Sequence, residues 1–429
     1  MIGSRNGTLA VGIASAAAVV ALLFGLAADR ASAATVACGD TLTRDTTLQA
    51  DLTCSGDGLI IGADRITVDL NGHTVSSSCV SAPCPVTDGI DNGGGYDNVR
   101  IVNGVVRYFE HSILLDGARR NTLSGLNLNG GGLDRSGSNA ISLTRSDDNV
   151  IANSVIMGGD PAVLLSNSDR NTISRSTING GISIRVGDGL VIRNGSNGNR
   201  VSNSDISGSG VGALVLDSRR NVLSQNSISA YAGGLMLSGA DDNTISRNIL
   251  GAPPFSDALG AFGGGSDGNK IERNVVTSSM RVVGDSNSIE RNEARAIRID
   301  GDANRIERNS ASANGVFDIN AILVSGGDRN VVERNRASGS FGEAVIRIEA
   351  AATRTMLTRN IATGGQDPYG TGNGDGIEVE APGTVISRNT ANDNQDLGID
   401  AVNGVIDGGG NHASGNGNPL QCVNVVCTP

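Results

Sequence analysis

The sequence predicts an all-β protein, namely a single-stranded right-handed parallel β-helix of roughly 15 coils with disulfide-stapled ends. Three observations predict this fold. A short phrase with two Asn recurs along the 429 residues, apolar and polar residues alternate over short runs, and aromatic residues make up only 2% of the chain. Because Phe, Tyr and Trp normally dominate the core of an enzyme of this size, their scarcity argues against most other globular folds. The 38% of hydrophobic residues argues against a disordered chain.

The recurring phrase is Asn-x-aliphatic-x-x-Asn. Its clearest copies begin at Asn243, Asn269, Asn287, Asn304 and Asn330, with looser copies at Asn98, Asn121, Asn149, Asn171, Asn199 and Asn221 and later ones at Thr355 and Thr384. Successive copies start 17 to 29 residues apart, most often 22. A second short apolar segment precedes each copy, as in Ala140–Thr144 and Gly376–Val379. Three short strands within about 22 residues correspond to one coil of a parallel β-helix, whereas a leucine-rich solenoid would show denser Leu and helical stretches.

The second Asn of the phrase occupies the same slot in eight consecutive repeats. These residues are Asn226, Asn248, Asn274, Asn292, Asn309, Asn335, Asn360 and Asn389. A tight turn between two strands needs one residue with positive φ, which Asn tolerates, so we expect the second Asn to adopt that conformation. Stacked coils would also place these amides one above another, where they can form hydrogen bonds along the stack.

The two ends of the chain carry export and capping signals. Residues 1–33 are expected to be a secretory signal peptide, with Arg5 at its basic start, the apolar run Leu9–Ala28 and a small-residue cleavage site at Ala31-Ser-Ala33. Retention of the apolar run as a membrane anchor is the alternative. We then expect an N-terminal cap with the first coils at 34–97, the repeats at 98–410 and a C-terminal cap at 411–429.

Six Cys form three close pairs in the exported part of the chain. The pairs are Cys38 with Cys54, Cys79 with Cys84, and Cys422 with Cys427. An even number of Cys in an exported chain favours local disulfides. Zinc binding is the competing interpretation, but the pairs lack His partners and stand at opposite ends of the chain.

These motifs resemble those of the bacterial exported right-handed parallel β-helix repeat proteins. The resemblance rests on Cys38-Gly-Asp40, Leu52-Thr-Cys54, Asp69-Leu-Asn-Gly-His-Thr74, the Asn phrases and Gly415-Asn-Gly-Asn-Pro-Leu-Gln-Cys422. This broad group shares its architecture with pectate lyases, polygalacturonases, mannuronan epimerases and NosD-type periplasmic proteins. The resemblance implies the fold and leaves the chemistry open. A mannuronan epimerase would carry Asp-Pro-His-Asp where this chain has Asp367-Pro-Tyr-Gly370. The Asn-Thr-Asp, Gly-His-Gly and Arg-Ile-Lys motifs of polygalacturonases do not occur, and Asp147-Asp148, which matches their Asp-Asp pair, precedes the first Asn of a phrase and is interpreted as part of a turn.

Charged residues near the C-terminal end form the candidate catalytic group. Alternation along the aligned strands places Arg347, Glu378 and Asp400 outward on neighbouring coils, with Glu349 and Glu380 in a second outward column. Asp367 and Asp375 lie in the long loop nearby. Closely packed carboxylates would raise one pKa and provide a general acid, or hold Ca²⁺, the one cofactor considered. A surface ladder of ion pairs is the structural alternative.

Aromatic residues in the longer loops are candidates for substrate contact. Phe255, Phe262, Phe317 and Tyr369 fall in or beside these loops, and Phe317 and Tyr369 are grouped with Asp367, Glu349 and Glu380 as substrate-binding residues. Exposed rings can stack on sugar faces, or they can cap open ends of the hydrophobic stack. Another set of charges, Glu272, Glu290, Glu307 and Glu333 beside Arg273, Arg291, Arg308 and Arg334, is interpreted as structural.

The sequence therefore predicts a secreted monomer that recognises an extracellular polysaccharide, and it leaves open whether the protein also processes that polysaccharide by lyase-like or hydrolytic chemistry. The alternatives are a non-catalytic surface or adhesion scaffold and a NosD-like periplasmic accessory protein. A net charge of −11 argues against nucleic acid and anionic lipid as partners. The three His, at 73, 111 and 412, are scattered, which argues against a copper or zinc site. No membrane span is expected after signal cleavage.

Overall fold

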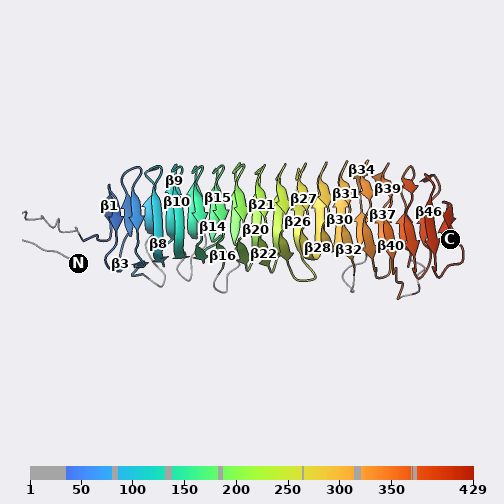
Figure 1. The fold of residues 1–429 in the computed structure, drawn as a ribbon, viewed down its shortest axis with the longest axis horizontal. Helices are drawn as coiled ribbons and strands as arrows, with labels where there is room; N and C mark the ends of the chain where they lie inside the picture. The colour runs from blue at the N-terminus through green and yellow to red at the C-terminus, as the bar shows by residue number, and fades with distance from the viewer. Residues whose placement is uncertain are drawn as a thin grey trace, which may run out of the picture. The chain divides into compact units, whose positions relative to one another are not determined.

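The computed structural model describes residues 35–79, 86–130, 138–181, 187–262, 265–313, 320–368, 370 and 374–429. The expected signal peptide at 1–33, Cys84, Phe317 and Tyr369 lie outside these residues. Residues Val36–Pro429 form one compact unit, and it is a parallel β-helix (Figure 1). The described residues form strands and turns and contain no helix, so none of them belongs to a helix able to cross a membrane. The predicted fold class is confirmed.

Three rows of parallel strands run along this unit, and each coil contributes one strand to each row. Row 1 consists of β1 (Asp40–Leu42), β4 (Leu59–Ile61), β7 (Asp88–Asn92), β9 (His111–Asp116), β11 (Asn139–Thr144), β14 (Val163–Ser166), β17 (Leu190–Arg193), β20 (Val211–Leu216), β23 (Gly233–Ser238), β26 (Asp257–Phe262), β28 (Val275–Val283), β30 (Glu293–Asp300), β33 (Ile322–Val324), β37 (Ile346–Ile348), β41 (Ile377–Val379), β44 (Ile399–Ala401) and β47 (Cys422–Val423).

Row 2 follows row 1 in each coil. It consists of β2 (Thr46–Thr47), β5 (Thr67–Asp69), β8 (Arg100–Arg107), β10 (Thr122–Asn129), β12 (Val150–Ala152), β15 (Thr172–Ser174), β18 (Arg200–Ser202), β21 (Val222–Ser224), β24 (Thr244–Ser246), β27 (Lys270–Glu272), β29 (Ser288–Glu290), β31 (Arg305–Glu307), β35 (Val331–Glu333), β39 (Met356–Thr358), β42 (Val385–Ser387) and β45 (Ile406–Asp407). A separate pair, β34 (Gly327–Asp328) and β38 (Ala352–Thr353), joins two turns.

Row 3 completes the coil. It consists of β3 (Leu52–Cys54), β6 (Thr74–Ser77), β13 (Val155–Met157), β16 (Thr177–Gly180), β19 (Asp205–Gly208), β22 (Ser227–Ala230), β25 (Ile249–Gly251), β32 (Ser310–Ser312), β36 (Arg336–Ser338), β40 (Ile361–Thr363), β43 (Thr390–Asn392), β46 (Asn411–Ser414) and β48 (Cys427–Thr428). The long strands β8 and β10 bend from row 2 into row 3, and β28 and β30 bend from row 3 into row 1.

Aliphatic side chains fill the interior in straight columns. In row 2, Ile245, Ile271, Ile289 and Ile306 pair in register on successive coils and are fully buried. Neighbouring coils are only about 4.8 Å apart, so an aliphatic side chain is required at the same inward slot in successive coils. This repeated requirement explains the period in the sequence and the low content of aromatic rings.

The second Asn of each phrase forms a buried ladder, as predicted. The Oδ1 of Asn248 accepts the backbone N–H of Asn226 at 2.9 Å and its Nδ2–H at 3.1 Å, and Asn274 does the same for Asn248. The Nδ2 of Asn248 also donates to the carbonyl of Leu223 at 2.9 Å. A parallel ladder of the first Asn of each phrase links the turns between rows 1 and 2. These amides satisfy backbone groups that the turns would otherwise leave buried and unpaired.

The prediction that this Asn adopts positive φ is wrong. The left-handed residue is the one before it, at Gln225, Arg247, Arg273, Arg291, Arg308, Arg334, Arg359 and Arg388, with φ between 54° and 58°. The Asn must point inward to reach its hydrogen-bond partners, so the preceding residue makes the turn and leaves its long side chain in solvent.

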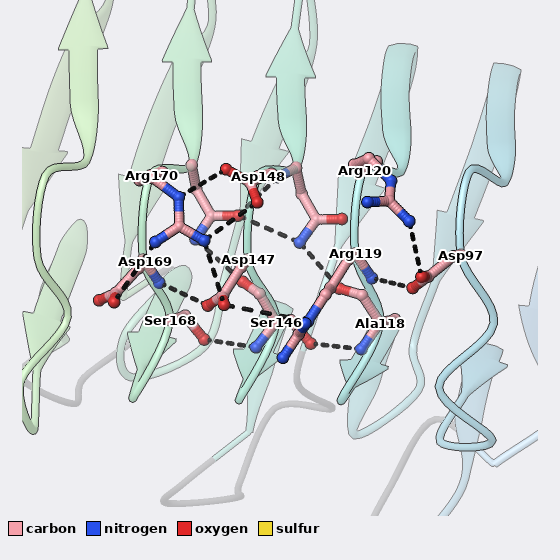
Figure 2. A network of polar contacts seen from close by, with 12 residues as sticks. Asp97, Ala118, Arg119, Arg120, Ser146, Asp147, Asp148, Ser168, Asp169 and Arg170 are labelled. Atoms are coloured by element: carbon pink, nitrogen blue, oxygen red, sulfur yellow. Dashed lines mark hydrogen bonds and ion pairs between the residues drawn. The ribbon is translucent and has the colours of Figure 1, made fainter.

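Turn residues on the outside form a second type of ladder (Figure 2). Asp97 accepts the backbone N–H of Arg119 at 2.7 Å, and Asp147 accepts that of Asp169 at 2.9 Å. Arg170 donates to Asp148 at 2.8 Å and thereby holds the pKa of that carboxyl below its usual value. The pair Asp147-Asp148 therefore consists of turn residues, as the sequence indicated.

The charged stripe of Glu and Arg is an ion-pair ladder. Glu272, Glu290, Glu307 and Glu333 stand in register. Arg334 lies 3.3 Å from Glu307 and 2.8 Å from Glu333, and so bridges two coils. At the ends, disulfides join Cys38 to Cys54 and Cys422 to Cys427 as expected, and Cys79 is also disulfide-bonded.

Replacing one interior amide tests the ladder. We expect Asn248→Ala to lower the free energy of unfolding by about 2–4 kcal/mol, because it leaves the buried N–H groups of Asn226 without an acceptor. Asn179→Ala, at an exposed position of row 3, is the matched control and should change it by less than about 0.5 kcal/mol. Guanidinium unfolding curves of the three proteins give the comparison, and equal losses in both variants would contradict the structural role of the ladder.

Candidate functional site

Row 1 brings Arg347, Glu378 and Asp400 together on its outer face. Arg347 pairs with Glu378, and Glu378 pairs with Asp400, in the register of β37, β41 and β44. The flanking Ile residues of these strands are buried, so alternation sends the charged side chains outward. The predicted neighbourhood of the three residues is thus present, while their role remains a prediction.

Carboxylates surround Arg347. Its guanidinium contacts Glu343, lies 2.7 Å from Glu380 and lies 3.4 Å from Glu378. The arginine side chain is mostly buried, and its charge is already shared among three acids. This one positive charge offsets part of the negative charge of the group that we call the acidic cluster, made up of Glu343, Asp375, Glu378, Glu380 and Asp400.

Asp375 is the most perturbed member of the acidic cluster. It lies at the start of the segment leading into β41, is only 3% exposed and accepts the backbone N–H of Leu397 at 2.8 Å. Burial raises its pKa from 3.8 to about 7, and the nearby Asp396, Asp400 and Glu378 act in the same direction. A carboxyl with this pKa is partly protonated near neutral pH, which a general acid requires.

The pKa values of two further carboxyls of the acidic cluster are also raised. Burial raises the pKa of Glu378 despite the opposing effect of Arg347. Burial, together with Asp396, raises the pKa of Asp400. A ladder of ion pairs would have lowered these values, so desolvation outweighs pairing at this place.

The other predicted residues are distributed as follows. Glu349 follows β37, and its charge contributes to the raised pKa of Glu378. Asp367 is buried, and its backbone is bonded in both directions to Gln395, at 2.7 and 3.2 Å. Glu349 therefore borders the acidic cluster, whereas the cited hydrogen bonds tie Asp367 to the segment of Gln395. Phe317 and Tyr369 lie outside the described residues.

An exposed aromatic pair lies elsewhere on the coil, where row 3 turns into row 1. Tyr231 follows β22 and Phe255 follows β25, on adjacent coils, and their rings meet edge to face with centroids 5.7 Å apart. They are 65% and 63% exposed. The loop lengths in the sequence predict Phe255 as a contact residue and give no indication of Tyr231. Their equivalent position after consecutive row 3 strands is the signal that could have revealed the pair.

The sequence also matches a family model, described as periplasmic copper-binding protein (NosD), over residues 65–252 and 185–289. The two matches overlap and together span slightly more than half of the chain. The chain belongs to the NosD family. The acidic cluster lies beyond the matched region, whereas the aromatic pair lies within it. No curated protein sequence is similar enough to this chain to count as a match.

Solved structures similar to this NosD-family chain are parallel β-helices at low identity. A tailspike protein of E. coli bacteriophage HK620 in complex with a hexasaccharide has 12% identity, covers 90% of this chain and 72% of its own, and gives a TM-score of 0.45. DFA-IIIase from Arthrobacter chlorophenolicus A6 in complex with DFA-III has 13% identity, coverage of 82% and 83%, and a TM-score of 0.37.

The described His and Cys of this NosD-family chain are not arranged as a copper site. Copper favours imidazole, thiolate and thioether ligands. His73 is 3.1 Å from Asp51 and His111 is 2.8 Å from Asp88, whereas His412 lies on β46 near the other end of the chain. The described Cys are all in disulfides. No group of three or more His, Cys, Asp or Glu in the described ranges is arranged to hold a metal. We therefore derive no role for copper.

Removing the charge of Asp375 tests its environment. Because its pKa is raised in the folded chain, folding is favoured by its protonated form, and that contribution is lost as the pH rises from about 4 through 7. Relative to Asp375→Asn, the unmodified protein should lose up to about 4 kcal/mol of unfolding free energy between about pH 4 and 8. Urea unfolding at a series of pH values measures this. Parallel curves for the two proteins would show that Asp375 ionises normally.

Proposed function

We propose that the protein is exported and binds a polysaccharide on the side of its coil, with Tyr231 and Phe255 as the stacking surface. The observation that carries this proposal is the exposure of both rings in a chain with only four Tyr and six Phe. Phe109, by contrast, is fully buried in the core. Two large rings left in water on adjacent coils are unfavourable for the free protein, and they suit a ligand with apolar faces.

Hydrogen bonds also fix the loop that carries Phe255. The loop before β26 carries Phe255, and within it the backbone N–H of Ser256 donates to the carbonyl of Pro253 at 2.9 Å. The hydroxyl of Ser278 on the next coil donates to the carbonyl of Ser256 at 2.7 Å. A surface fixed before binding loses less conformational entropy when the ligand arrives. A ring pair on such a support favours recognition over a purely structural capping role.

Binding measurements with ring variants test the proposal. Tyr231→Ala and Phe255→Ala should each weaken binding of a recognised polysaccharide about tenfold, equivalent to about 1.4 kcal/mol. Leu420→Ala removes another exposed apolar side chain, at the C-terminal end, and serves as the control. Affinity electrophoresis through gels containing neutral or acidic polysaccharides, with and without Ca²⁺, gives the comparison. Retardation that is equal in all variants would exclude the rings as the binding surface and favour a scaffold role.

The acidic cluster favours a second function, hydrolytic or lyase-like processing of the bound chain. The supporting observation is that one buried carboxyl, Asp375, has a pKa of about 7 beside Glu378 and Asp400. A neutral carboxyl can donate a proton to a leaving oxygen, while a neighbouring carboxylate accepts one or stabilises developing positive charge.

Product analysis tests this second function separately. If the acidic cluster is catalytic, incubation with a polysaccharide panel should shorten chains or create unsaturated ends, and Asp375→Asn or Glu378→Gln should reduce the rate at least about 100-fold. Asp393→Asn, on an exposed turn nearby, is the control. Cleavage that survives both variants would place the reaction elsewhere, and an unchanged chain length on every polysaccharide would leave binding as the function.

A further inference from the structure

We infer that row 3 carries a subsite for a neutral oligosaccharide, which lies along the strands between a polar depression and the aromatic pair. This inference rests on the proposed function and specifies its ligand. The depression has an open volume of about 440 Å³, and its lining includes Asn203, Asp205, Gln225, Ser227, Arg247 and Ile249. These residues come from three successive coils, on β19, β22 and β25 and the turns just before them.

One strand leads from the depression to the rings. Ser227 lines the depression and begins β22, and Tyr231 follows directly after the end of that strand. The four-residue separation corresponds to about 13 Å of extended chain. The depression and the aromatic pair therefore lie at opposite ends of the same narrow face. The distance between them matches the length of a short oligosaccharide.

Only small residues lie on the sheet surface between the depression and the aromatic pair. Ser207, Ser229 and Gly251 pair in register across β19, β22 and β25. Their small side chains leave room above the sheet, while Tyr231 and Phe255 project at one end. Ile249 and Val275 are exposed on the same face, at 56% and 42%. The face thus combines apolar surface with small hydroxyls, which matches the apolar faces and polar edges of sugar rings.

The charges of the depression indicate a neutral ligand. Asp205 and Arg247 lie two coils apart, with Gln225 on the coil between them. Neither charged side chain is held in an ion pair with another described residue. One anion, one cation, amides and a hydroxyl supply donors and acceptors without net charge, as sugar hydroxyls require. An acidic glycan would also be repelled by the net charge of −11 on the protein.

The backbone makes these side chains available. Asn203, Gln225 and Arg247 have φ of 52°, 58° and 57°, and each immediately precedes a residue of the buried ladder. The ladder fixes the turn, and the left-handed residue presents its side chain to solvent. Substitution by Gly at these positions removes the side chain without backbone strain, which allows a clean test.

Isothermal titration of the full chain with cellohexaose and maltohexaose as neutral probes, and a galacturonate hexamer as the acidic probe, tests the subsite. We expect a neutral probe to bind, with an affinity that changes less than about twofold between low and high salt. Gln225→Gly and Arg247→Gly should each weaken it about tenfold. Arg388→Gly, the same turn position on a distant coil, should have no effect.

Each alternative result has a distinct meaning. If the ring variants lose binding while Gln225→Gly and Arg247→Gly keep it, the proposed function stands and this subsite is wrong. Preferential binding of the acidic probe, weakened by salt, overturns the choice of a neutral ligand. Binding of none of the probes contradicts both proposals. A dimer in sedimentation experiments that Tyr231→Ala dissociates would instead make this face an interface between copies of the chain.

Discussion

The hydrogen bonds between side-chain amides and the turns of the next coil are the interaction on which this structure depends. Parallel strands satisfy their own backbone groups, but the turns between rows leave N–H groups facing the interior. At many of these turns an Asn supplies both an acceptor for the coil before it and donors for carbonyls of the stack, as Asn248 does for Asn226 and Leu223. On earlier coils Ser154, Ser176 and Ser204 take the same slot. Because a buried unpaired group costs about 1–3 kcal/mol, this requirement recurs in every coil.

Because the ladder amides must point inward, the residue before each of them presents its side chain on the outer surface. The residue before each ladder Asn must adopt positive φ, and its side chain then points into solvent with few packing constraints. On some coils Arg at this slot pairs with stacked Glu, as Arg334 does with Glu307 and Glu333. On the coils of Gln225 and Arg247 the same slot borders an open depression. The scaffold thus separates a strictly repeated interior from a surface that can differ from coil to coil.

The sequence predicted the fold well because the interior repeats. The Asn phrase and the inward Ile residues are local patterns. Because every stacked coil needs them again, they recur in the sequence with a clear period. The same reasoning failed for the left-handed residue, since tolerance of positive φ was considered without the competing need to bury the amide. The disulfides at both ends followed from spacing alone, because their partners are close in sequence.

The surface was less predictable, because its properties depend on contacts between coils. Register placed Arg347, Glu378 and Asp400 correctly, yet the burial that gives Asp375 its raised pKa comes from loops whose course no local pattern describes. Tyr231 and Phe255 are 24 residues apart, and only the superposition of two coils makes them a pair. In a β-helix, functional residues therefore become visible when outward positions are compared across successive coils. Two exposed rings among Ser, Gly, Ala and Pro are such a departure from the repeat, and only a comparison of adjacent coils brings them to notice.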